Sequence, residues 1–344
     1  MSGKEPPPPP GRQALVPGGA YSFPVEQTQD TRWFGFLLLP EFTLLAFSSA
    51  LDPLRIANQL AQQPLYGWRV FSQDGQPVPS SSGVDVGAHG ALADLTHDIR
   101  LFVCSGNRGT EAADEPTLAA IRRHVRHGGK LGGICTGAAT LARAGVLDGR
   151  RFTLHWENQP GFVEVFPHLT PTRNRFEDDR GVLTCGGGSA ATEMMLKVIA
   201  RDFGQDFAIV VADMCLNDPD LSGRREQRSS IAKAIDSRNP KLLAAVQRMY
   251  ANIEEPLSLD AISDQCGLSR RQLERHFRNL LLEPPAVIYR NIRLERARAL
   301  MVETDMSVIE VAMACGFNSA NVFSRHFKDR YGETPFGLRG KRPD

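Results

Sequence analysis

The sequence has no uninterrupted run of about eighteen apolar residues, the length that a membrane-spanning helix requires. It begins with a proline tract at residues 6–10 and lacks the charged and apolar regions of a secretory signal. Its six cysteines are widely spaced and form no CxxC pair, which argues against a disulfide framework and a zinc site. We therefore expect a cytoplasmic protein with reduced thiols, no metal, no cofactor and no membrane partner.

A large excess of one charge is also absent, because the formal net charge at pH 7 is only +1. This excludes a uniformly basic protein that coats nucleic acid. The charge is unevenly divided, however. Residues 1–223 carry 19 Lys and Arg against 24 Asp and Glu, whereas residues 224–344 carry 21 against 15. The basic C-terminal part is therefore the candidate for binding a polyanion such as DNA.

The 344 residues are more than one hydrophobic core usually supports, so the sequence predicts two folded units. Residues 1–31 hold seven of the 23 prolines and few large apolar residues, and we expect them to be disordered. Residues 32–216 show alternating strand and helix patterns, and residues 217–239 form a polar linker. Residues 240–340 show helical patterns alone.

The alternation in the first unit predicts an α/β fold. Short apolar runs typical of buried strands are followed by segments whose apolar residues have helical spacing. The expected strands are residues 33–39, 68–71, 101–104, 130–134 and 182–185, and the expected helices are residues 44–56, 117–127, 138–144 and 190–201. This order predicts a mostly parallel sheet flanked by helices on both faces.

Three of the expected strands end at a cysteine that small residues follow. In an open parallel sheet, ligands bind beyond the carboxyl ends of the strands, so we expect these turns to meet at one crevice. The backbone amides near Cys135 and Thr136, and near Gly187 and Gly188, are candidates for holding a carboxylate, because the following helices point their positive ends there. Alternatively, the glycine run only forms a tight turn.

The C-terminal region repeats itself. Cys266 corresponds to Cys315 at an offset of 49, and His276 corresponds to His326 at an offset of 50. In each copy a short helical pattern ends at a glycine, and a capping residue opens a second helix, which is the pattern of a helix-turn-helix unit. Residues 285–303 between the copies are expected to form one long helix that fixes their spacing.

The second helix of each copy has a polar outer face rich in arginine, asparagine and serine, which hydrogen-bond base edges and phosphates. We predict DNA contacts from Ser269, Arg270, Arg271 and Arg275 in the first copy and from Asn318, Ser319, Asn321 and Arg325 in the second. Two such helices about one turn of DNA apart suit successive segments of the major groove. In the alternative interpretation, these residues are an ordinary solvated helix surface.

Residues 240–340 resemble the DNA-binding domain of the AraC/XylS-type regulators. The resemblance covers both copies and is most specific at residues 309–317, 323–328 and 331–335. It implies that double-stranded promoter DNA and RNA polymerase are partners.

Residues 32–215 resemble the PfpI-like, class I glutamine amidotransferase-like domains, which have a flavodoxin-like fold. Residues 132–138 match the nucleophile elbow of that family, and His155 matches its usual histidine. The resemblance raises an alternative function, in which the chain is a cysteine-dependent hydrolase or amidotransferase with a DNA-binding tail. Cys135 would then be the nucleophile, activated by the nearby imidazole.

One departure from the family pattern argues against this enzyme. The carboxylate that the family's enzymes and redox-active members place on the first helix falls on Ala46 here, while Asp52 lies further along and Glu41 is the remaining substitute. Without a carboxylate beside the thiol, the site lacks its proton relay. We therefore predict no catalytic residue and no enzyme activity.

Together, the two halves resemble the GlxA-type AraC regulators from about residue 32 to residue 340, with matching segments at residues 36–40, 50–58, 135–137 and 155–157. This resemblance implies a homodimeric, ligand-responsive activator of a catabolic operon, with a quaternary ammonium compound or an amino acid as its effector. For that effector we predict a site formed by Cys135, Thr136, His155, Trp156, Gly187 and Gly188, with Trp156, Phe42 and Phe47 as candidates for an aromatic cage.

Overall fold

The computed structural model describes residues 14–26, 30–109, 111–217, 221–222, 227 and 240–339. The chain divides into two compact units, one of Met1–Gln159 with Phe166–Gln227 and one of Pro160–Val165 with Arg228–Asp344. No helix within the described ranges is long and apolar enough to cross a membrane.

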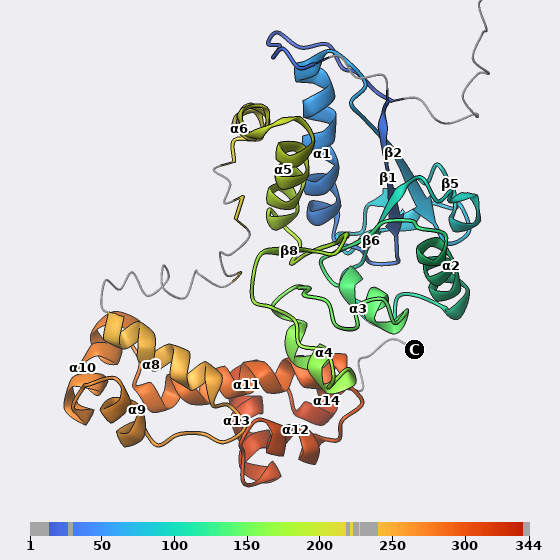
Figure 1. Cartoon of the computed structure of the whole chain (residues 1–344). Helices are drawn as coiled ribbons and strands as arrows, with labels where there is room; N and C mark the ends of the chain where they lie inside the picture. Colours follow the sequence, from blue (N-terminus) through green and yellow to red (C-terminus); the bar gives the residue numbers. More distant parts are fainter. Residues whose placement is uncertain are drawn as a thin grey trace, which may run out of the picture. The chain divides into compact units, whose positions relative to one another are not determined.

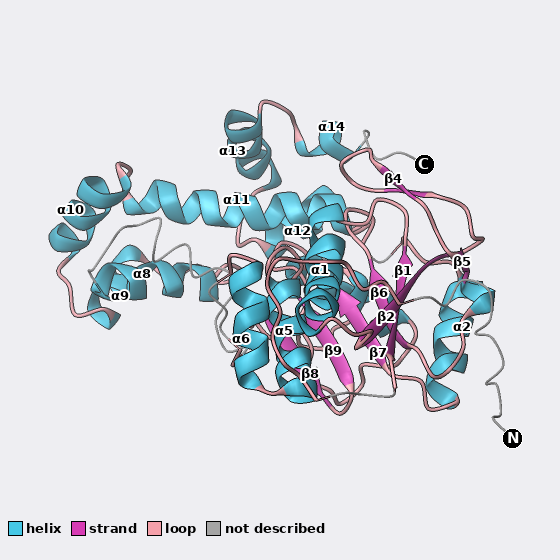
Figure 2. Cartoon of the chain, turned by 90° about the horizontal axis from the view of Figure 1, so that it is seen from above, coloured by secondary structure: helices cyan, strands magenta, loops and turns pink. Residues whose placement is uncertain are grey.

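The first unit is built on a seven-stranded sheet (Figures 1 and 2). From one edge to the other the strands are β5 (Gly90–Ala91), β2 (Tyr66–Ser72), β1 (Arg32–Leu38), β6 (Arg100–Cys104), β7 (Leu131–Ile134), β9 (Val182–Cys185) and β8 (Phe176–Asp179). All neighbouring strands are parallel except β8, which runs antiparallel to β9 at the edge. A separate pair, β3 (Val78–Pro79) and β4 (Asp85–Val86), is antiparallel.

Helices cover both faces of this sheet. The helices α1 (Leu44–Ala61), α5 (Ala190–Phe203) and α6 (Gln205–Met214) pack together on one face, whereas α2 (Glu115–Arg126) and α3 (Gly137–Arg143) lie on the other (Figures 1 and 2). The 3-10 turn η1 (Leu92–Asp94) also belongs to the first unit, whereas the short helix α4 (Gln159–Val165) groups with the second unit from Pro160 onward.

The sheet is buried because its central strands carry apolar side chains on both faces. Phe36 of β1 and Phe102 of β6 are fully buried and stack with ring centroids 5.9 Å apart. A parallel sheet covered on both faces needs such continuous apolar strands. The prediction of an α/β fold with a mostly parallel, helix-flanked sheet is therefore confirmed.

The N-terminal residues 14–26 differ from the disorder that we expected for residues 1–31. The Phe23 amide donates to the Leu60 carbonyl oxygen at 2.8 Å, and the Phe23 ring lies 5.6 Å from the Phe207 ring between centroids. Asn58, which is fully buried, donates to the Leu15 carbonyl oxygen at 2.9 Å. The few apolar residues of this segment are enough to pack it against α1 and α6. The rest of the predicted segment up to residue 29 lies outside the described residues.

The second unit contains α8 (Pro240–Ala251), α9 (Leu259–Gln265), α10 (Arg270–Leu281), α11 (Pro285–Glu303), α12 (Val308–Ala314), α13 (Ala320–Tyr331) and α14 (Pro335–Arg339). It has two hydrophobic cores, one formed largely by α8, α9 and α10 and the other by α11, α12 and α13. Most of the predicted linker, residues 217–239, lies outside the described residues.

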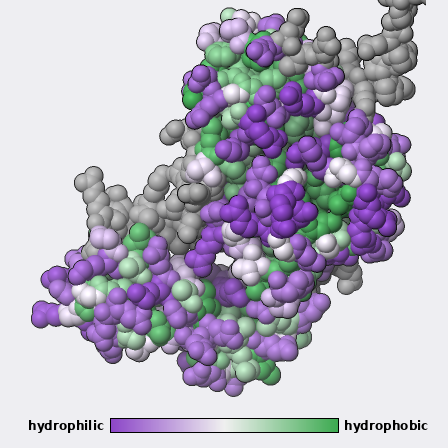
Figure 3. All heavy atoms as spheres, in the orientation of Figure 1, coloured by the Kyte–Doolittle hydropathy of each residue, from purple (hydrophilic) through white to green (hydrophobic). Residues whose placement is uncertain are grey.

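The repeat extends further than the sequence indicated, because α8 corresponds to α11. Leu242 and Met249 of α8 are buried in the first core, and Leu294 and Met301 occupy the equivalent places in the second, at an offset of 52 residues. Each copy is therefore a three-helix unit with its own core. The face of the molecule in Figure 3 is mostly hydrophilic, with hydrophobic residues in smaller patches.

Candidate ligand site and DNA interface

Cys135 lies in the sharp turn between β7 and α3. Its backbone has a φ of 59°, a left-handed conformation that is uncommon for residues other than glycine. Its amide donates to the Cys185 carbonyl oxygen at 3.1 Å, and its carbonyl oxygen accepts from the His155 amide at 3.4 Å. These contacts bring the ends of β7 and β9 and the segment at residue 155 to one place, as we expected from the strand ends.

The second turn of the crevice follows β9. Gly187 is buried with a φ of 82°, and a Cβ on this residue would lie 2.8 Å from the Cys135 Cβ and 3.2 Å from its Sγ. Gly188 also has a positive φ, of 54°, but nothing lies within 4 Å of its Cβ position. The glycine run therefore does more than turn the chain. A residue without a side chain is needed at position 187 for the backbone to approach the Cys135 thiol.

His155 and Trp156 form one wall of this region. Their ring centroids are 5.5 Å apart, and Trp156 is 38% exposed. Thr136 is buried, and its hydroxyl donates to the Gly106 carbonyl oxygen at 2.8 Å. Its side chain therefore holds the loop after β6, and its backbone hydrogen-bonds to the Cys135 thiol.

The electrostatic setting of Cys135 favours the neutral thiol. Burial raises the pKa of the Cys135 thiol, with an opposing hydrogen bond of 3.5 Å from the Thr43 hydroxyl to Sγ. Burial lowers the pKa of His155, although Glu157 nearby acts in the opposite direction. A thiolate paired with an imidazolium, the reactive form of a cysteine nucleophile, is therefore disfavoured on both sides.

Within the part of the chain that the structure describes, the hydrogen bonds to the Cys135 thiol come from Thr43 and Thr136 and not from a carboxylate. Ala46 is buried in the core of α1 and carries no proton-transferring group. Glu41 adopts a φ of 60°, and its backbone amide and carbonyl bind Pro79 and Asn107. Among the described residues, the polar side chain recorded against the Cys135 Sγ is the hydroxyl of Thr43, and a hydroxyl cannot replace a carboxylate as a base at neutral pH.

The prediction of an aromatic cage that includes Phe42 and Phe47 is wrong. Both rings are buried and pack against each other with centroids 5.8 Å apart, and Phe47 also contacts Phe36. Phe42 precedes α1 and is not part of it. Both rings belong to the core, which leaves Trp156 as the exposed aromatic residue of the three candidates.

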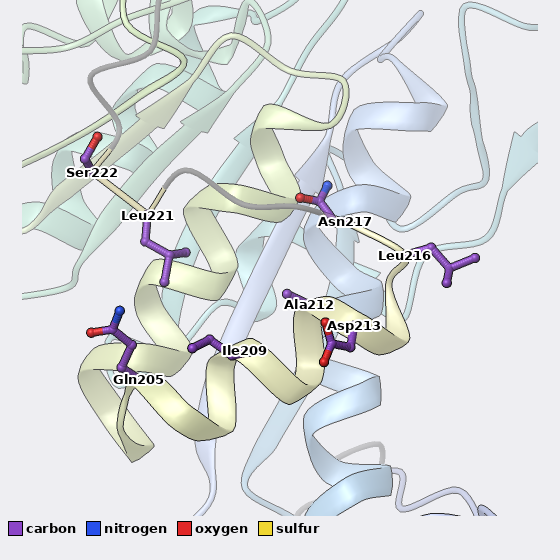
Figure 4. Close-up of a pocket in the computed structure, with 8 residues that line it drawn as sticks. All are labelled: Gln205, Ile209, Ala212, Asp213, Leu216, Asn217, Leu221 and Ser222. Atoms are coloured by element: carbon purple, nitrogen blue, oxygen red, sulfur yellow. The ribbon is translucent and has the colours of Figure 1, made fainter.

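A pocket of about 760 Å³ lies away from this crevice (Figure 4). It is lined by α6 and the segment after it, namely Gln205, Ile209, Ala212, Asp213, Leu216, Asn217, Leu221 and Ser222. None of the six residues predicted to bind a ligand lines it.

Two polar residues near the crevice were not found from the sequence. Arg175 is paired with the buried Glu193 at 2.7 Å, and it also donates to the Ser189 hydroxyl at 3.0 Å in the turn after Gly188. Gln227 reaches the same area and hydrogen-bonds to the segment around Trp156. Within the described residues, no group of three or more His, Cys, Asp or Glu side chains could hold a metal ion.

The two turns of the second unit have the geometry of helix-turn-helix units. Gly267 and Gly316 end α9 and α12 with φ values of 61° and 68°. Ser269 caps α10 by accepting from the Gln272 amide at 3.2 Å, and Ser319 caps α13 by accepting from the Val322 amide at 3.5 Å. The structure thus gives both serine hydroxyls a role in starting the helix.

The exposed faces of α10 and α13 match position by position. From residue 271 to 280 and from residue 321 to 330 the two helices have the same order of buried, half-buried and exposed residues. Arg271 and Arg275 of α10 are exposed, and Asn321 and Arg325 stand at the equivalent exposed positions of α13. Such pairs, one helical turn apart, project from the same side of a helix.

The remaining predicted residues have different surroundings. Arg270 is held by ion pairs to Asp260 at 3.2 Å and to Glu274 at 3.1 Å, so part of its hydrogen-bonding capacity is used within the protein. Asn318 is exposed in the turn before α13, where the second copy has one residue more than the first.

Two cations hold the carbonyl groups of the turns. Lys241 of α8 donates to the Gly267 carbonyl oxygen at 2.8 Å. At the same place in the second copy, Arg293 of α11 donates to the carbonyl oxygens of Cys315 and Gly316. Arg293 lies in the long helix that we expected at residues 285–303, and its contacts also make it part of the second turn.

The geometry therefore defines a class of protein, a DNA-binding protein in which an α/β unit precedes two helix-turn-helix units in the sequence. Family models agree with both parts. Residues 262–341 match the helix-turn-helix domain model, and residues 56–201 match that of the DJ-1/PfpI family.

The chain is similar over most of its length to two transcriptional regulators. It is 39% identical to HTH-type transcriptional regulator CdhR of Pseudomonas aeruginosa over 310 residues, which cover 90% of this chain and 92% of that protein. It is 40% identical to HTH-type transcriptional regulator GlxA of Rhizobium meliloti over 313 residues, covering 91% and 97%. It is also 28% identical to isonitrile hydratase of Pseudomonas putida over 180 residues, 52% of this chain and 75% of that enzyme.

The chain belongs to the family of these regulators, in which a DJ-1/PfpI domain precedes an AraC-type helix-turn-helix domain. It is a DNA-binding transcription regulator. The resemblance that residues 309–317 and 135–137 indicated is thereby confirmed.

Proposed function

We propose that this regulator binds a small metabolite in the crevice around Cys135 and changes transcription in response. The observation that supports this best is the convergence of the Cys135 elbow, the close turn at Gly187 and the wall of His155 and Trp156 at the carboxyl edge of the sheet. This edge is where open α/β sheets hold their ligands.

The effector class follows from the groups that the crevice offers. Backbone amides near Thr136 and Gly188 suit a carboxylate, and the half-exposed ring of Trp156 suits an ammonium or quaternary ammonium group. We therefore propose an amino acid or a betaine-like zwitterion. A thermal-shift panel of both kinds tests this, since a ligand that binds only the folded state raises Tm. No shift with any member would contradict the proposal.

The reading surface consists of α10 and α13. Because α11 has 19 residues and is about 28 Å long, it can hold the two helices near the roughly 34 Å spacing of successive major-groove segments. We propose that Arg271, Arg275, Asn321 and Arg325 contact base edges, that Asn318 approaches the DNA from the turn, and that Ser269, Ser319 and Arg270 contact phosphates in addition to their contacts within the protein.

The effect of this regulator on transcription is proposed from the family to which the chain belongs. We propose activation of a catabolic operon by a homodimer that contacts RNA polymerase in the cytoplasm. The test is fluorescence anisotropy with promoter fragments against random duplex at physiological salt, with and without the candidate zwitterions. Equal affinity for promoter fragments and random duplex, both with and without the zwitterions, would contradict regulation of a specific operon.

The second candidate, a cysteine-dependent hydrolase or amidotransferase, is favoured by the strained elbow at Cys135 and opposed by the protonated thiol. We propose that the site has no catalytic role. Turnover of the wild type and of Cys135→Ala separates the two, because an enzyme shows a turnover that this change abolishes, whereas a binding site shows none in either protein.

A further inference from the structure

The side chain of Gln227 is held by a set of hydrogen bonds that the sensing function does not require. Its Nε2 donates to the Thr153 hydroxyl at 3.0 Å and to the carbonyl oxygens of Leu154 and Asn174, both at 2.9 Å. Its Oε1 accepts from the Trp156 amide at 2.9 Å. Every polar atom of the carboxamide is therefore matched by the opposite kind of group.

The surroundings of this site fit a carboxamide in shape as well. The backbone amide of Gln227 donates to the Arg173 carbonyl oxygen at 3.0 Å, which also holds the residue by its main chain. Gly186 lies directly against the Gln227 carboxamide. A Cβ at this buried position would collide with the carboxamide.

The site is prepared by residues that are themselves held in place. The Thr153 amide donates to the buried Thr184 hydroxyl at 2.9 Å, which ties the segment to β9. The Leu154 carbonyl oxygen also accepts from the Gln159 side chain at 3.2 Å. Three acceptor oxygens on one side and one amide donor on the other select a primary carboxamide over a carboxylate, which would bring its negative charge against the three oxygens.

We propose that the first unit contains a binding site for a primary carboxamide, formed by Thr153, Leu154, Trp156, Asn174 and Gly186, and that Gln227 is its resident ligand. The site attaches Gln227 to the segment that carries Trp156. Because the Trp156 amide binds Gln227 while its ring lines the proposed effector crevice, movement of this residue alters the attachment. That last consequence rests on the proposed function, whereas the site itself does not.

The test uses the full chain without DNA or effector, so its failure is separate from failure of the proposed function. Hydrogen–deuterium exchange is measured at the Trp156 amide in the wild type, Gln227→Ala and Gln227→Glu. We expect exchange to rise about tenfold in both variants, since a lost hydrogen bond of ordinary strength has about that effect. Gln205→Ala, at an exposed glutamine of α6, is the matched control and should leave it unchanged.

Chemical rescue then identifies the ligand class. Propionamide, which has the carboxamide that Gln227→Ala removes, should restore protection at Trp156 in that variant at millimolar concentrations and have no effect on the wild type. Propionate, of nearly the same size, should not restore it. Unchanged exchange in both variants, or equal rescue by propionate, would overturn the proposal. Gln227→Glu keeps the test decisive if Gln227→Ala proves unstable, because it preserves the side-chain volume.

Discussion

The guanidinium of Arg293 lies over the ring of Phe317, 4.1 Å from its centroid, while its N–H groups bind the carbonyl oxygens at the end of α12. Arg293 comes from the long helix α11, and Phe317 follows the glycine of the second turn. This contact fixes the second turn to the helix that spaces the two copies. Burial lowers the pKa of Arg293, but a guanidinium stays charged throughout the physiological range.

Arg293→Met should therefore destabilise the second three-helix unit. We expect a loss of about 2 kcal/mol in the free energy of unfolding, since charge-assisted hydrogen bonds and a cation–π contact are removed from a half-buried site. Lys241→Met removes the equivalent but exposed contact of the first unit and should cost less than about 1 kcal/mol. Urea denaturation of both variants measures this. Equal losses would show that Arg293 has no special role.

Some elements of the fold could be predicted from the sequence, and others could not. The strands β1, β2, β6, β7 and β9 were predictable because the long buried strands are rich in apolar residues, as at residues 101–104, whereas the two-residue strands β3, β4 and β5 are too short to give such a pattern. The edge strand β8 was missed because three of its four residues are acidic. The two helix-turn-helix units were predictable from local glycine and serine signals, which act within a few residues.

The candidate site was only partly predictable for the same reason. Cys135 and Gly187 are recognisable from their neighbours in sequence, but their approach depends on the neighbouring positions of β7 and β9 in the sheet. The partners of Gln227 are up to 74 residues away, so no local pattern announces them. Phe42 and Phe47 were wrong as cage candidates because the sequence does not show which aromatic rings are buried, and both of these rings lie in the core.

Gly187→Ala and Gly188→Ala should separate close packing from backbone strain. Both residues have positive φ, so each change should cost about 1 kcal/mol or more for conformation alone. Only Gly187→Ala also places a Cβ 2.8 Å from the Cys135 Cβ, and we expect it to lose about 1–3 kcal/mol more. Urea denaturation at neutral pH is the measurement. If the two variants are equally stable, the approach of the turn to the thiol is not as close as described.

The raised pKa of the Cys135 thiol predicts slow alkylation at neutral pH. A buried thiol whose folded pKa is raised keeps its proton to higher pH, so iodoacetamide should react more slowly with Cys135 than with free cysteine at pH 7.5. Its rate should still be rising above pH 9. The raised pKa also makes the free energy of unfolding depend on pH, because the folded state favours the protonated thiol. Its contribution is present below the unfolded pKa and is lost as pH rises through the folded one.

Mass spectrometry of the native chain against time gives the alkylation rate at each cysteine. Cys215 is an internal comparison, since burial raises its pKa to about 11. Alkylation of Cys135 at pH 7 that outpaces free cysteine would indicate a thiolate and would revive the enzyme alternative.

The equivalent exposed positions of α10 and α13 predict which residues read bases. Arg271→Ala and Asn321→Ala should each weaken binding to the cognate site by about 1–3 kcal/mol and relax its sequence preference, because a lost base contact leaves binding to unrelated duplex unchanged. Arg270→Ala is the control on the same helix. Because we propose that Arg270 contacts a phosphate in addition to its ion pairs with Asp260 and Glu274, this change should weaken binding to cognate and random duplex alike. Anisotropy titrations with both duplexes at two salt concentrations measure the difference. A uniform loss across sequences in Arg271→Ala and Asn321→Ala would assign these side chains to the phosphates.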